Sequence, residues 1–224
     1  MIKMVVFDMA GTVVDEQNVV YKTLQDAINH AGMPVSLKEV LISGAGKEKK
    51  EAIKDMLAAH APKQTSEAID NIYQHFLEKL DVAYSSLQVV PVKGAEEVFD
   101  ILRSHGIKVT LNTGYNHATA ENLLKKLGWF KGIHYDELVT ASDVMHARPK
   151  PDMILRAMQL EGINNPAEVL KIGDSVVDIE EGKNAGCGIT VGITTGAQTR
   201  EQLTAANPDY IIDGLLELPK LAGL

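Results

Sequence analysis

The sequence Lys3-Met4-Val5-Val6-Phe7-Asp8-Met9-Ala10-Gly11-Thr12, near the start of the chain, gives the strongest indication of its architecture. Residues 3–7 form a short apolar run rich in branched side chains, which is typical of a buried β-strand. Asp8 follows the run directly. Because ligands of open α/β sheets bind at the carboxyl ends of the strands, we expect Asp8 to be a nucleophile or a metal ligand. The alternative is that Asp8 caps a turn.

The same strand-like pattern recurs in the second half of the chain, where helical patterns separate the apolar runs. The further strands are predicted at residues 107–111, 169–172, 189–191 and 210–212. The helices between them are predicted at residues 95–105, 118–127, 152–160 and 178–185. Strands that alternate with helices of this length predict an α/β fold with a parallel, Rossmann-like sheet.

This alternation stops between residues 16 and 89, where no strand-like run occurs. Helical patterns cover residues 21–31, 36–42, 48–59 and 66–83, with a turn at Ala61-Pro62 before the last of them. We therefore predict that residues 16–89 form an all-helical domain inserted into a core made of residues 1–15 and 90–224. A chain of 224 residues has room for one core domain and such an insert.

Composition and charge exclude several classes of protein. Hydrophobic residues make up 45% of the chain and charged residues 23%, as is usual for globular proteins. The net charge of −8 argues against nucleic-acid binding. No segment approaches the roughly 20 apolar residues that span a membrane, so we expect no membrane partner. The single cysteine, Cys187, allows no intramolecular disulfide, and we therefore expect a cytoplasmic protein.

Two further segments at strand ends carry groups that bind phosphate. In Leu111-Asn112-Thr113-Gly114-Tyr115, a hydroxyl and backbone N–H groups precede a helix, which favours a phosphate cradle. An ordinary helix cap is the alternative there. In Ala147-Arg148-Pro149-Lys150-Pro151-Asp152, a cation beside prolines precedes a helix and could bind an oxyanion. A solvated basic loop is the alternative for this second segment.

A pair of acids follows another predicted strand, in Lys171-Ile172-Gly173-Asp174-Ser175-Val176-Val177-Asp178. Mg²⁺ prefers carboxylate oxygens, water and substrate phosphate as ligands. Asp174 and Asp178 would form such a site together with Asp8, so we expect Mg²⁺ as cofactor. The alternative is that the two acids complement the dipole of the helix that begins there.

Taken in order, these four segments resemble the motifs of the haloacid dehalogenase superfamily of phosphotransferases, over nearly the whole chain. The resemblance implies a Rossmann-like core with an inserted helical cap of the C1 type. It implies that Asp8 is the nucleophile and forms an aspartyl-phosphate. Thr113 and Arg148 would bind the phosphoryl group. Asp8, Asp174 and Asp178 would hold Mg²⁺.

Ala10 departs from this pattern, because the common family pattern has a second aspartate two residues after the nucleophile. That acid protonates the leaving oxygen of a phosphoester and later activates water. An alanine side chain transfers no proton, although the Ala10 carbonyl can still ligate Mg²⁺ and the backbone near Gly11 can hold phosphoryl oxygens. Loss of a general acid costs an ester phosphatase a factor of roughly 10²–10⁴. Either the enzyme is impaired, or its leaving group is not an oxygen.

Ala10, an arginine at position 148 and the sequence Thr113-Gly114-Tyr115 together resemble one branch of the superfamily, the phosphonoacetaldehyde hydrolases and their relatives. This branch breaks a carbon–phosphorus bond. A carbanion is a very poor leaving group, and a lysine of the cap solves this by forming a Schiff base that accepts the electrons. The resemblance thus links the missing acid at Ala10 to a required lysine.

The first candidate for that lysine is Lys49, because Gly46, Lys49 and Ile53 match the Gly-x-x-Lys-x-x-x-Ile/Val pattern of the branch. Lys47, with Gly44 as the glycine, is the second candidate. The reacting amine must be neutral, and burial or nearby cations would lower the pKa of a lysine from about 10.4. Two alternatives stay open: the cation binds the distal anion of the substrate, or it belongs to a solvated surface.

One expected group is missing from the pattern of this branch. Phosphonoacetaldehyde hydrolases carry a histidine three residues after the lysine, where this chain has Ala52. Tyr115, in contrast, matches the aromatic residue of the second motif. The sequence does not place the histidines that could replace the proton shuttle, which are His60, His75, His117 and His146.

The resemblance therefore predicts a Mg²⁺-dependent hydrolase that cleaves the C–P bond of a small 2-oxo-alkylphosphonate such as phosphonoacetaldehyde. A phosphatase for a phosphoester with a good leaving group is one alternative, and a catalytically silent phosphate-binding protein is another. Asp8 and the acidic pair argue against the silent protein. The expected partner is a small phosphonate or phosphate, and the resemblance implies a homodimer formed through the cap. Which group activates the hydrolytic water stays open.

Overall fold

A parallel sheet of six strands forms the centre of the computed structural model, which describes residues 1–60 and 65–224. The strand order is β5-β4-β1-β6-β7-β8. The strands are β1 (Met4–Asp8), β4 (Lys108–Thr113), β5 (Glu137–Thr140), β6 (Val169–Gly173), β7 (Ile189–Ile193) and β8 (Tyr210–Ile212). Every neighbouring pair is parallel, and β1 pairs with β4 on one side and β6 on the other. The predicted α/β fold is confirmed.

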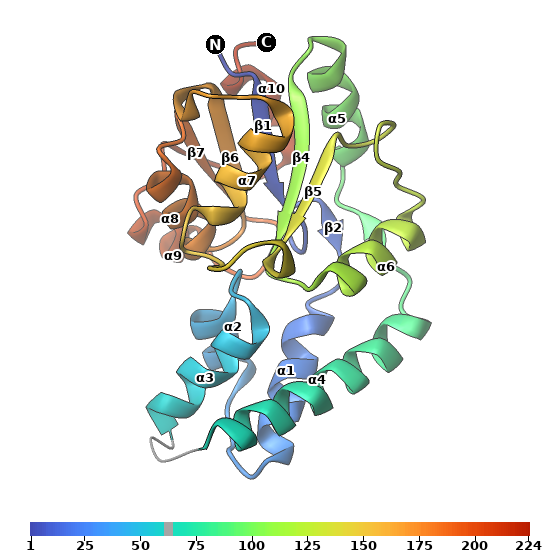
Figure 1. The fold of residues 1–224 in the computed structure, drawn as a ribbon, viewed down its shortest axis with the longest axis vertical. Coiled ribbons are helices and arrows are strands. Elements are labelled where there is room, and N and C mark those ends of the chain that lie inside the picture. Colours follow the sequence, from blue (N-terminus) through green and yellow to red (C-terminus); the bar gives the residue numbers. More distant parts are fainter. Residues whose placement is uncertain (61–64) are drawn as a thin grey trace.

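Helices cover both faces of this sheet (Figure 1). They are α5 (Ala95–Ser104), α6 (His117–Leu127), α7 (Asp152–Glu161), α8 (Val176–Ala185), α9 (Arg200–Ala205) and α10 (Leu218–Leu221). Alternate side chains of β1 point to opposite faces of the sheet. Because helices cover both faces, the strand is apolar along its whole run. Phe7 packs edge-on against Phe99 of α5, whereas Val6 lies in a separate apolar cluster with Met153 of α7.

Four consecutive helices lie between β1 and the rest of the sheet, and we call residues 16–89 the helical insert. They are α1 (Val19–His30), α2 (Leu37–Gly44), α3 (Lys49–His60) and α4 (Ser66–Ser86). These helices pack on one another and lie at the carboxyl ends of the strands, at the opposite end of the molecule from the two termini (Figure 1). We propose that the insert is a separate domain, as the sequence predicts.

A short antiparallel pair of strands, β2 (Val14–Asp15) and β3 (Val90–Pro91), connects the core to the helical insert. The chain leaves the core through β2 and returns through β3. A further backbone bond, from Val92 N to Val13 O at 2.9 Å, extends this pair. The connection is narrow, so the insert is joined to the core at one place in the chain and otherwise rests against it.

The strands that carry the candidate site extend beyond their apolar runs. β1 includes Asp8 and β4 continues to Thr113, so that polar residues belong to the strand ends. The apolar pattern does not predict β5, because this edge strand has only Leu138 and Val139 as apolar residues. Strands β2 and β3 have two residues each and are too short to show any pattern.

The helices of the insert agree closely with their predicted ranges. The predicted turn at Ala61-Pro62 lies outside the described residues. Within residues 1–60 and 65–224, no helix combines the length and the apolar composition that crossing a membrane requires.

Candidate active site

A small cavity lies where the ends of β1 and β4 meet the helical insert. Residues of both parts line it: Asp8, Ala10, Tyr21, Gly46, Lys49, Thr113, Gly114, Tyr115 and Arg148. Its free volume is about 10 Å³, the lower limit for a single water molecule. The structure therefore brings together nearly all of the residues singled out from the sequence, and it shows the insert closed over them.

Asp8 is the acidic centre of this cavity. Its side chain is nearly buried at the end of β1, and Arg148 Nη1 donates a hydrogen bond to Asp8 Oδ1 at 2.6 Å. Thr12 Oγ1 donates a longer bond to Asp8 Oδ2 at 3.4 Å. Burial and the charge of Asp178 raise the pKa of Asp8, while the charges of Arg148 and Lys171 oppose the rise. Asp8 thus presents a poorly hydrated carboxylate beside a fixed cation.

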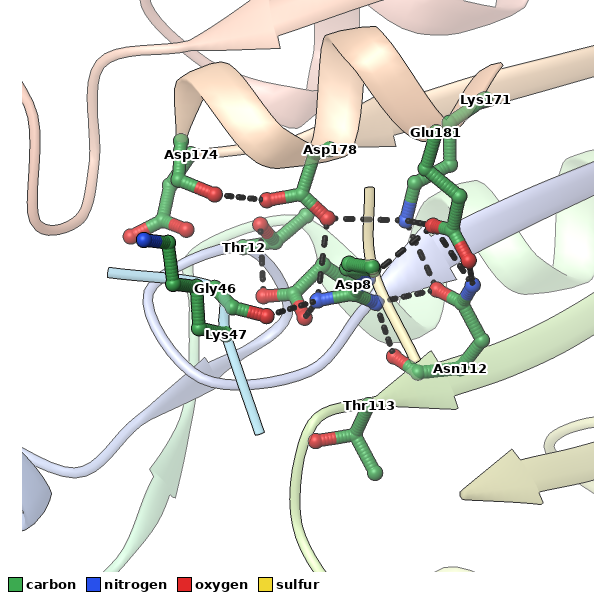
Figure 2. Close-up of polar contacts among 12 residues, drawn as sticks. Asp8, Thr12, Gly46, Lys47, Asn112, Thr113, Lys171, Asp174, Asp178 and Glu181 are labelled. Carbon is green, nitrogen blue, oxygen red and sulfur yellow. Dashed lines mark hydrogen bonds and ion pairs between the residues drawn. The ribbon is translucent and has the colours of Figure 1, made fainter. Parts of the chain in front are cut away.

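A network of buried charges holds Arg148 in place, and its members Lys171, Asp178 and Glu181 are labelled in Figure 2. Arg148 Nε donates to Glu181 Oε2 at 3.0 Å, and its Nη2 donates to the carbonyl of Asn112 at 2.9 Å. Lys171 Nζ donates to Asn112 Oδ1 at 2.7 Å and lies 2.9 Å from Asp178 Oδ1. Because each buried charge has a partner of opposite sign, the network offsets the cost of desolvation and fixes the guanidinium next to Asp8.

Three buried carboxylates meet at the edge of the cavity. Oxygens of Asp8, Asp174 and Asp178 all lie within 4.8 Å of one another. Burial and the charges of the other two acids raise the pKa of Asp174 well above its usual value. In Asp178, the charges of Arg148 and Lys171 outweigh burial and lower the pKa. The cluster therefore concentrates negative charge, and Asp174, unlike Asp8 and Asp178, has no ion pair among the described residues.

One oxygen of this cluster lacks a partner. Asp174 Oδ2 accepts a hydrogen bond from Ala197 N at 2.6 Å, but the buried Oδ1 has no hydrogen bond to any part of the chain that the structure describes. A hard divalent cation would partner this oxygen and relieve the repulsion among the three acids. Asp8, Asp174 and Asp178 therefore fit a Mg²⁺ ion on the chemistry of their oxygens.

Lys49 lies at the first turn of α3 and is the only lysine among the described residues that line the cavity. Its Nζ donates to the carbonyl of Lys47 at 2.6 Å. Two aromatic rings flank it, with the centroid of Tyr21 at 5.3 Å and that of Tyr115 at 5.8 Å from Nζ. Burial lowers the pKa of Lys49 to about 8, against the opposing charge of Asp8.

Lys47 has a different environment from the one expected of a reacting amine. Its Nζ pairs with Asp55 at 2.7 Å, and its side chain does not line the cavity. Its backbone instead closes the site, because a Cβ on Gly114 would lie 2.7 Å from the Lys47 carbonyl oxygen. The structure thus separates the two lysine candidates: Lys49 lines the cavity together with Asp8 and Arg148, and Lys47 does not.

The remaining predicted residues divide into those at the cavity and those elsewhere. Thr113 is buried at the end of β4, and its Oγ1 accepts a hydrogen bond from Tyr115 N at 3.2 Å, apart from the charge network (Figure 2). Ala52 is fully buried and carries no polar group. The histidines considered as proton shuttles, His60, His75, His117 and His146, all lie outside the cavity lining.

Sequence patterns did not single out several buried polar residues of this site: Glu16, Tyr21, Tyr84, Asn112, Lys171 and Glu181. One signal was present for two of them. Lys171 is a charged residue within the apolar run of β6, and Glu181 follows Asp178 by one helical turn of α8. A charge in a fully buried strand requires a buried partner, so this pair could have been inferred.

Comparison with known proteins gives relatives over the whole length of the chain. A sequence profile of haloacid dehalogenase-like hydrolases matches residues 2–186. Phosphonoacetaldehyde hydrolase from Latilactobacillus sakei is 28% identical over 98% of this chain and 94% of its own length. The probable phosphatase IndB from Dickeya dadantii is 28% identical over 96% of this chain and 91% of its own length. The crystal structure of a phosphonoacetaldehyde hydrolase-like protein from Oleispira antarctica has a TM-score of 0.85 at 25% identity, over 99% of this chain and 91% of that one.

Proposed function

This chain belongs to the haloacid dehalogenase-like hydrolases, and on that premise we propose that it cleaves the C–P bond of a small 2-oxo-alkylphosphonate such as phosphonoacetaldehyde. The observation that carries the proposal is the pairing of Lys49 with Ala10 in one cavity. A buried amine shares the cavity with the proposed nucleophile, and the position of the usual proton donor holds a methyl group. This combination favours a leaving group that is activated through a carbonyl and is not protonated on oxygen.

Lys49 activates the substrate in this proposal. With a pKa of about 8, about one tenth of its side chains are neutral at pH 7, against fewer than about one in a thousand for an ordinary lysine. The neutral amine adds to the aldehyde carbon. The carbonyl oxygen takes up one proton from the attached nitrogen and the proton that the amine gave up on becoming neutral, and it leaves as water. The product is an iminium two atoms from phosphorus, which accepts the electrons of the breaking C–P bond.

Asp8 then attacks phosphorus, and the P–C bond breaks as the P–O bond forms. The electron pair of the P–C bond moves into the iminium and gives an enamine on Lys49. Arg148, Thr113 and backbone N–H groups near Ala10 and Gly11 hold the phosphoryl oxygens. Arg148 is well placed for this, because the charge network fixes its guanidinium beside the attacking carboxylate.

Two hydrolyses complete the cycle. The enamine takes up a proton at carbon, and water releases acetaldehyde from the resulting iminium and restores Lys49. A second water hydrolyses the aspartyl-phosphate and restores Asp8. Asp8, Asp174, Asp178 and the carbonyl of Ala10 are the groups that would hold Mg²⁺. When bound, the ion supplies positive charge that draws the phosphonate dianion toward the Asp8 carboxylate.

The helical insert would act as a cap in this cycle. The closed cavity of about 10 Å³ cannot hold a phosphonate, so the insert must move away from the core for substrate to enter. Closure then brings Lys49 to the substrate and excludes bulk water from the reacting atoms. The narrow β2–β3 connection is the natural place for this motion.

The proposal is tested by incubating the protein with phosphonoacetaldehyde and Mg²⁺ and measuring phosphate and acetaldehyde. We expect the two products in equal amounts. Lys49→Arg keeps the charge but forms no Schiff base, so it should abolish C–P cleavage. Lys54→Arg, on the exposed face of the same helix, should not. Asp8→Asn should also be inactive, with the exposed Asp100→Asn as its control.

The same assay separates this proposal from a phosphatase. If the wild-type protein hydrolyses small phosphoesters faster than phosphonoacetaldehyde, and Lys49→Arg retains that activity, the protein is a phosphatase and the C–P proposal is wrong. Retained C–P cleavage in Lys49→Arg would instead overturn the Schiff-base step.

A further inference from the structure

We propose that Glu16 stores the proton that is exchanged during Schiff-base formation, and that it communicates with the cavity through the hydroxyls of Tyr84 and Tyr115. The inference rests on the proposed reaction of Lys49. Glu16 touches no reacting atom in this arrangement. It is a positioning residue that acts through the two tyrosines.

The observation behind this proposal is a continuous chain of buried hydroxyl and carboxyl groups. Glu16 is 2% exposed, just after β2. Its Oε2 accepts hydrogen bonds from Val20 N at 2.9 Å and from Tyr84 Oη at 3.1 Å. Tyr84 Oη in turn lies 2.8 Å from Tyr115 Oη. Tyr115 lines the cavity, and the centroid of its ring lies 5.8 Å from Lys49 Nζ, so the chain leads from a buried acid to a residue that borders the proposed reaction site.

Four titratable groups from different segments interact with Glu16. They are Tyr21 of α1, Lys49 of α3, Tyr84 of α4 and Tyr115 after β4. Burial raises the pKa of Glu16 to about 7, against the hydrogen bonds it accepts and the charge of Lys49. Burial also raises the pKa of Tyr84 and the pKa of Tyr115 well above the usual value of a tyrosine. Near neutral pH, the carboxyl can therefore hold or release a proton, while the tyrosines stay neutral and pass protons on.

The direction of the hydrogen bonds depends on the proton of Glu16. When Glu16 is a carboxylate, Tyr84 donates to it and Tyr115 donates to Tyr84, so Tyr115 can accept a proton from the cavity. When Glu16 is protonated, it donates to Tyr84, Tyr84 donates to Tyr115, and Tyr115 donates into the cavity. Transfer of one proton along this chain reverses each bond, and no side chain has to move.

The proposed reaction needs this kind of exchange. Protonated Lys49 and the aldehyde become an iminium and one water, so nitrogen loses two protons and the carbonyl oxygen gains two. No proton is gained or lost overall, and a group that takes a proton from nitrogen and returns it to oxygen is sufficient. Ala52, one turn after Lys49, carries no such group, and no histidine is among the described residues lining the cavity.

The experiment is the pH profile of kcat for phosphonoacetaldehyde in Glu16→Gln, which keeps the size and the acceptor oxygen but does not ionise near neutral pH. We expect kcat to fall about 10²-fold, the limb of the profile near pH 7 to disappear, and KM to stay close to that of the wild type. Tyr84→Phe breaks the chain and leaves Glu16 in place, and it should lower kcat by a similar factor. Glu78→Gln and Tyr210→Phe are exposed control variants that should retain wild-type profiles.

The outcomes distinguish this inference from the proposed function. If the wild-type protein releases no phosphate from phosphonoacetaldehyde, both fail. If the wild type is active and Glu16→Gln keeps its kcat and pH profile, only the relay is wrong. A loss that is equal at every pH, together with a lower Tm, would assign Glu16 a structural role and also overturn the relay. Should Glu16→Gln not fold, an unchanged kcat in Tyr84→Phe would refute the relay by itself.

Discussion

Ala10 has no side-chain group that can transfer a proton, and this restricts the reactions that the site can catalyse. Ala10 lines the cavity together with Asp8 and is 8% exposed, so it borders the space in which we propose that the substrate reacts. A phosphatase would need a proton donor here. A C–P hydrolase has no bridging oxygen to protonate, and a methyl group is sufficient for it.

Restoring an acid at this position should therefore favour ester hydrolysis. We expect Ala10→Asp to raise the kcat/KM for a small alkyl phosphoester at least about tenfold, since a positioned general acid contributes roughly 10²–10⁴. Phosphate release from such an ester, for the wild type and the variant, measures the effect. Ala10→Asn is the matched control, because it has the same size but transfers no proton. An equal gain in both variants would show that Ala10 does not occupy the position of the acid.

Burial of the Lys49 amine lowers the stability of the folded protein near neutral pH. The proposed reaction explains why a lysine is nevertheless present at this position. Its pKa of about 8 in the folded protein lies below the value of about 10.5 in the unfolded chain, so folding favours the neutral amine. Its contribution to stability is complete above pH 10.5 and is lost as the pH falls through 8. At pH 7 the folded protein therefore pays to keep a charged amine in the cavity, while the reactive neutral amine increases as the pH rises toward 8.

Replacement of this amine should stabilise the protein while it removes activity. We expect Lys49→Met to raise the free energy of unfolding at pH 7 by about 1–3 kcal/mol, and the gain should shrink toward pH 10. Urea unfolding at both pH values gives the measurement, with the exposed Lys54→Met as control. Destabilisation by Lys49→Met at pH 7 would contradict a strained, desolvated lysine.

At the scale of secondary structure, the loop between α2 and α3 decides whether the insert can close. Its backbone lies against the residues that follow β4 and β6, with almost no space between them. A Cβ on Gly46 would lie 2.2 Å from Ser175 Oγ, and one on Gly114 would lie 2.7 Å from the carbonyl of Lys47. Glycine at both positions allows the loop to bring Lys49 down to the strand ends.

A methyl group at Gly114 should keep the insert from closing fully. We expect Gly114→Ala to lower kcat/KM for phosphonoacetaldehyde about tenfold or more, because displacement of a catalytic group by about 1 Å can cost 10²-fold. The Tm should change little, since the contact lies between the insert and the core. Gly214→Ala is the control, because a Cβ there meets no atom within 4 Å. Wild-type kinetics in Gly114→Ala would show that this contact does not control closure.

The elements themselves could largely be predicted, and the reasons are physical. Buried strands and amphipathic helices leave apolar periodicity in the sequence, and Asp8 and Thr113 could be placed because polar residues ended apolar runs. Asn112 and Glu16 could not, because their roles depend on partners far away in the chain, Arg148 and Tyr84. The choice between Lys49 and Lys47 likewise required the closed loop, since both lie within one short charged segment.

The whole molecule has a net charge of −8, and the site likewise contains more acidic than basic residues. Three buried cations, Lys49, Arg148 and Lys171, face five buried acids, Asp8, Glu16, Asp174, Asp178 and Glu181. Among the residues described, the site therefore has two more acids than cations before any substrate or metal binds. A divalent cation would balance this difference, which agrees with the unpartnered oxygen of Asp174.

Binding of Mg²⁺ should accordingly stabilise the folded protein. At a concentration 100 times its Kd, a ligand that binds only the folded state adds about 2.7 kcal/mol, which gives a clear rise in Tm. We expect Asp174→Asn to lose most of that rise, and the exposed Asp100→Asn to keep it. Thermal unfolding with and without Mg²⁺ measures both. An equal rise in wild type and Asp174→Asn would place the ion elsewhere.

The proposed covalent bond between Lys49 and the substrate carbonyl can be trapped by borohydride reduction. The protein is incubated with phosphonoacetaldehyde and Mg²⁺, reduced, digested and examined by mass spectrometry. We expect an alkyl group on the Lys49 peptide, loss of activity in proportion to its formation, and no such adduct in Lys49→Arg. Full turnover of phosphonoacetaldehyde with an unmodified Lys49 peptide would contradict it.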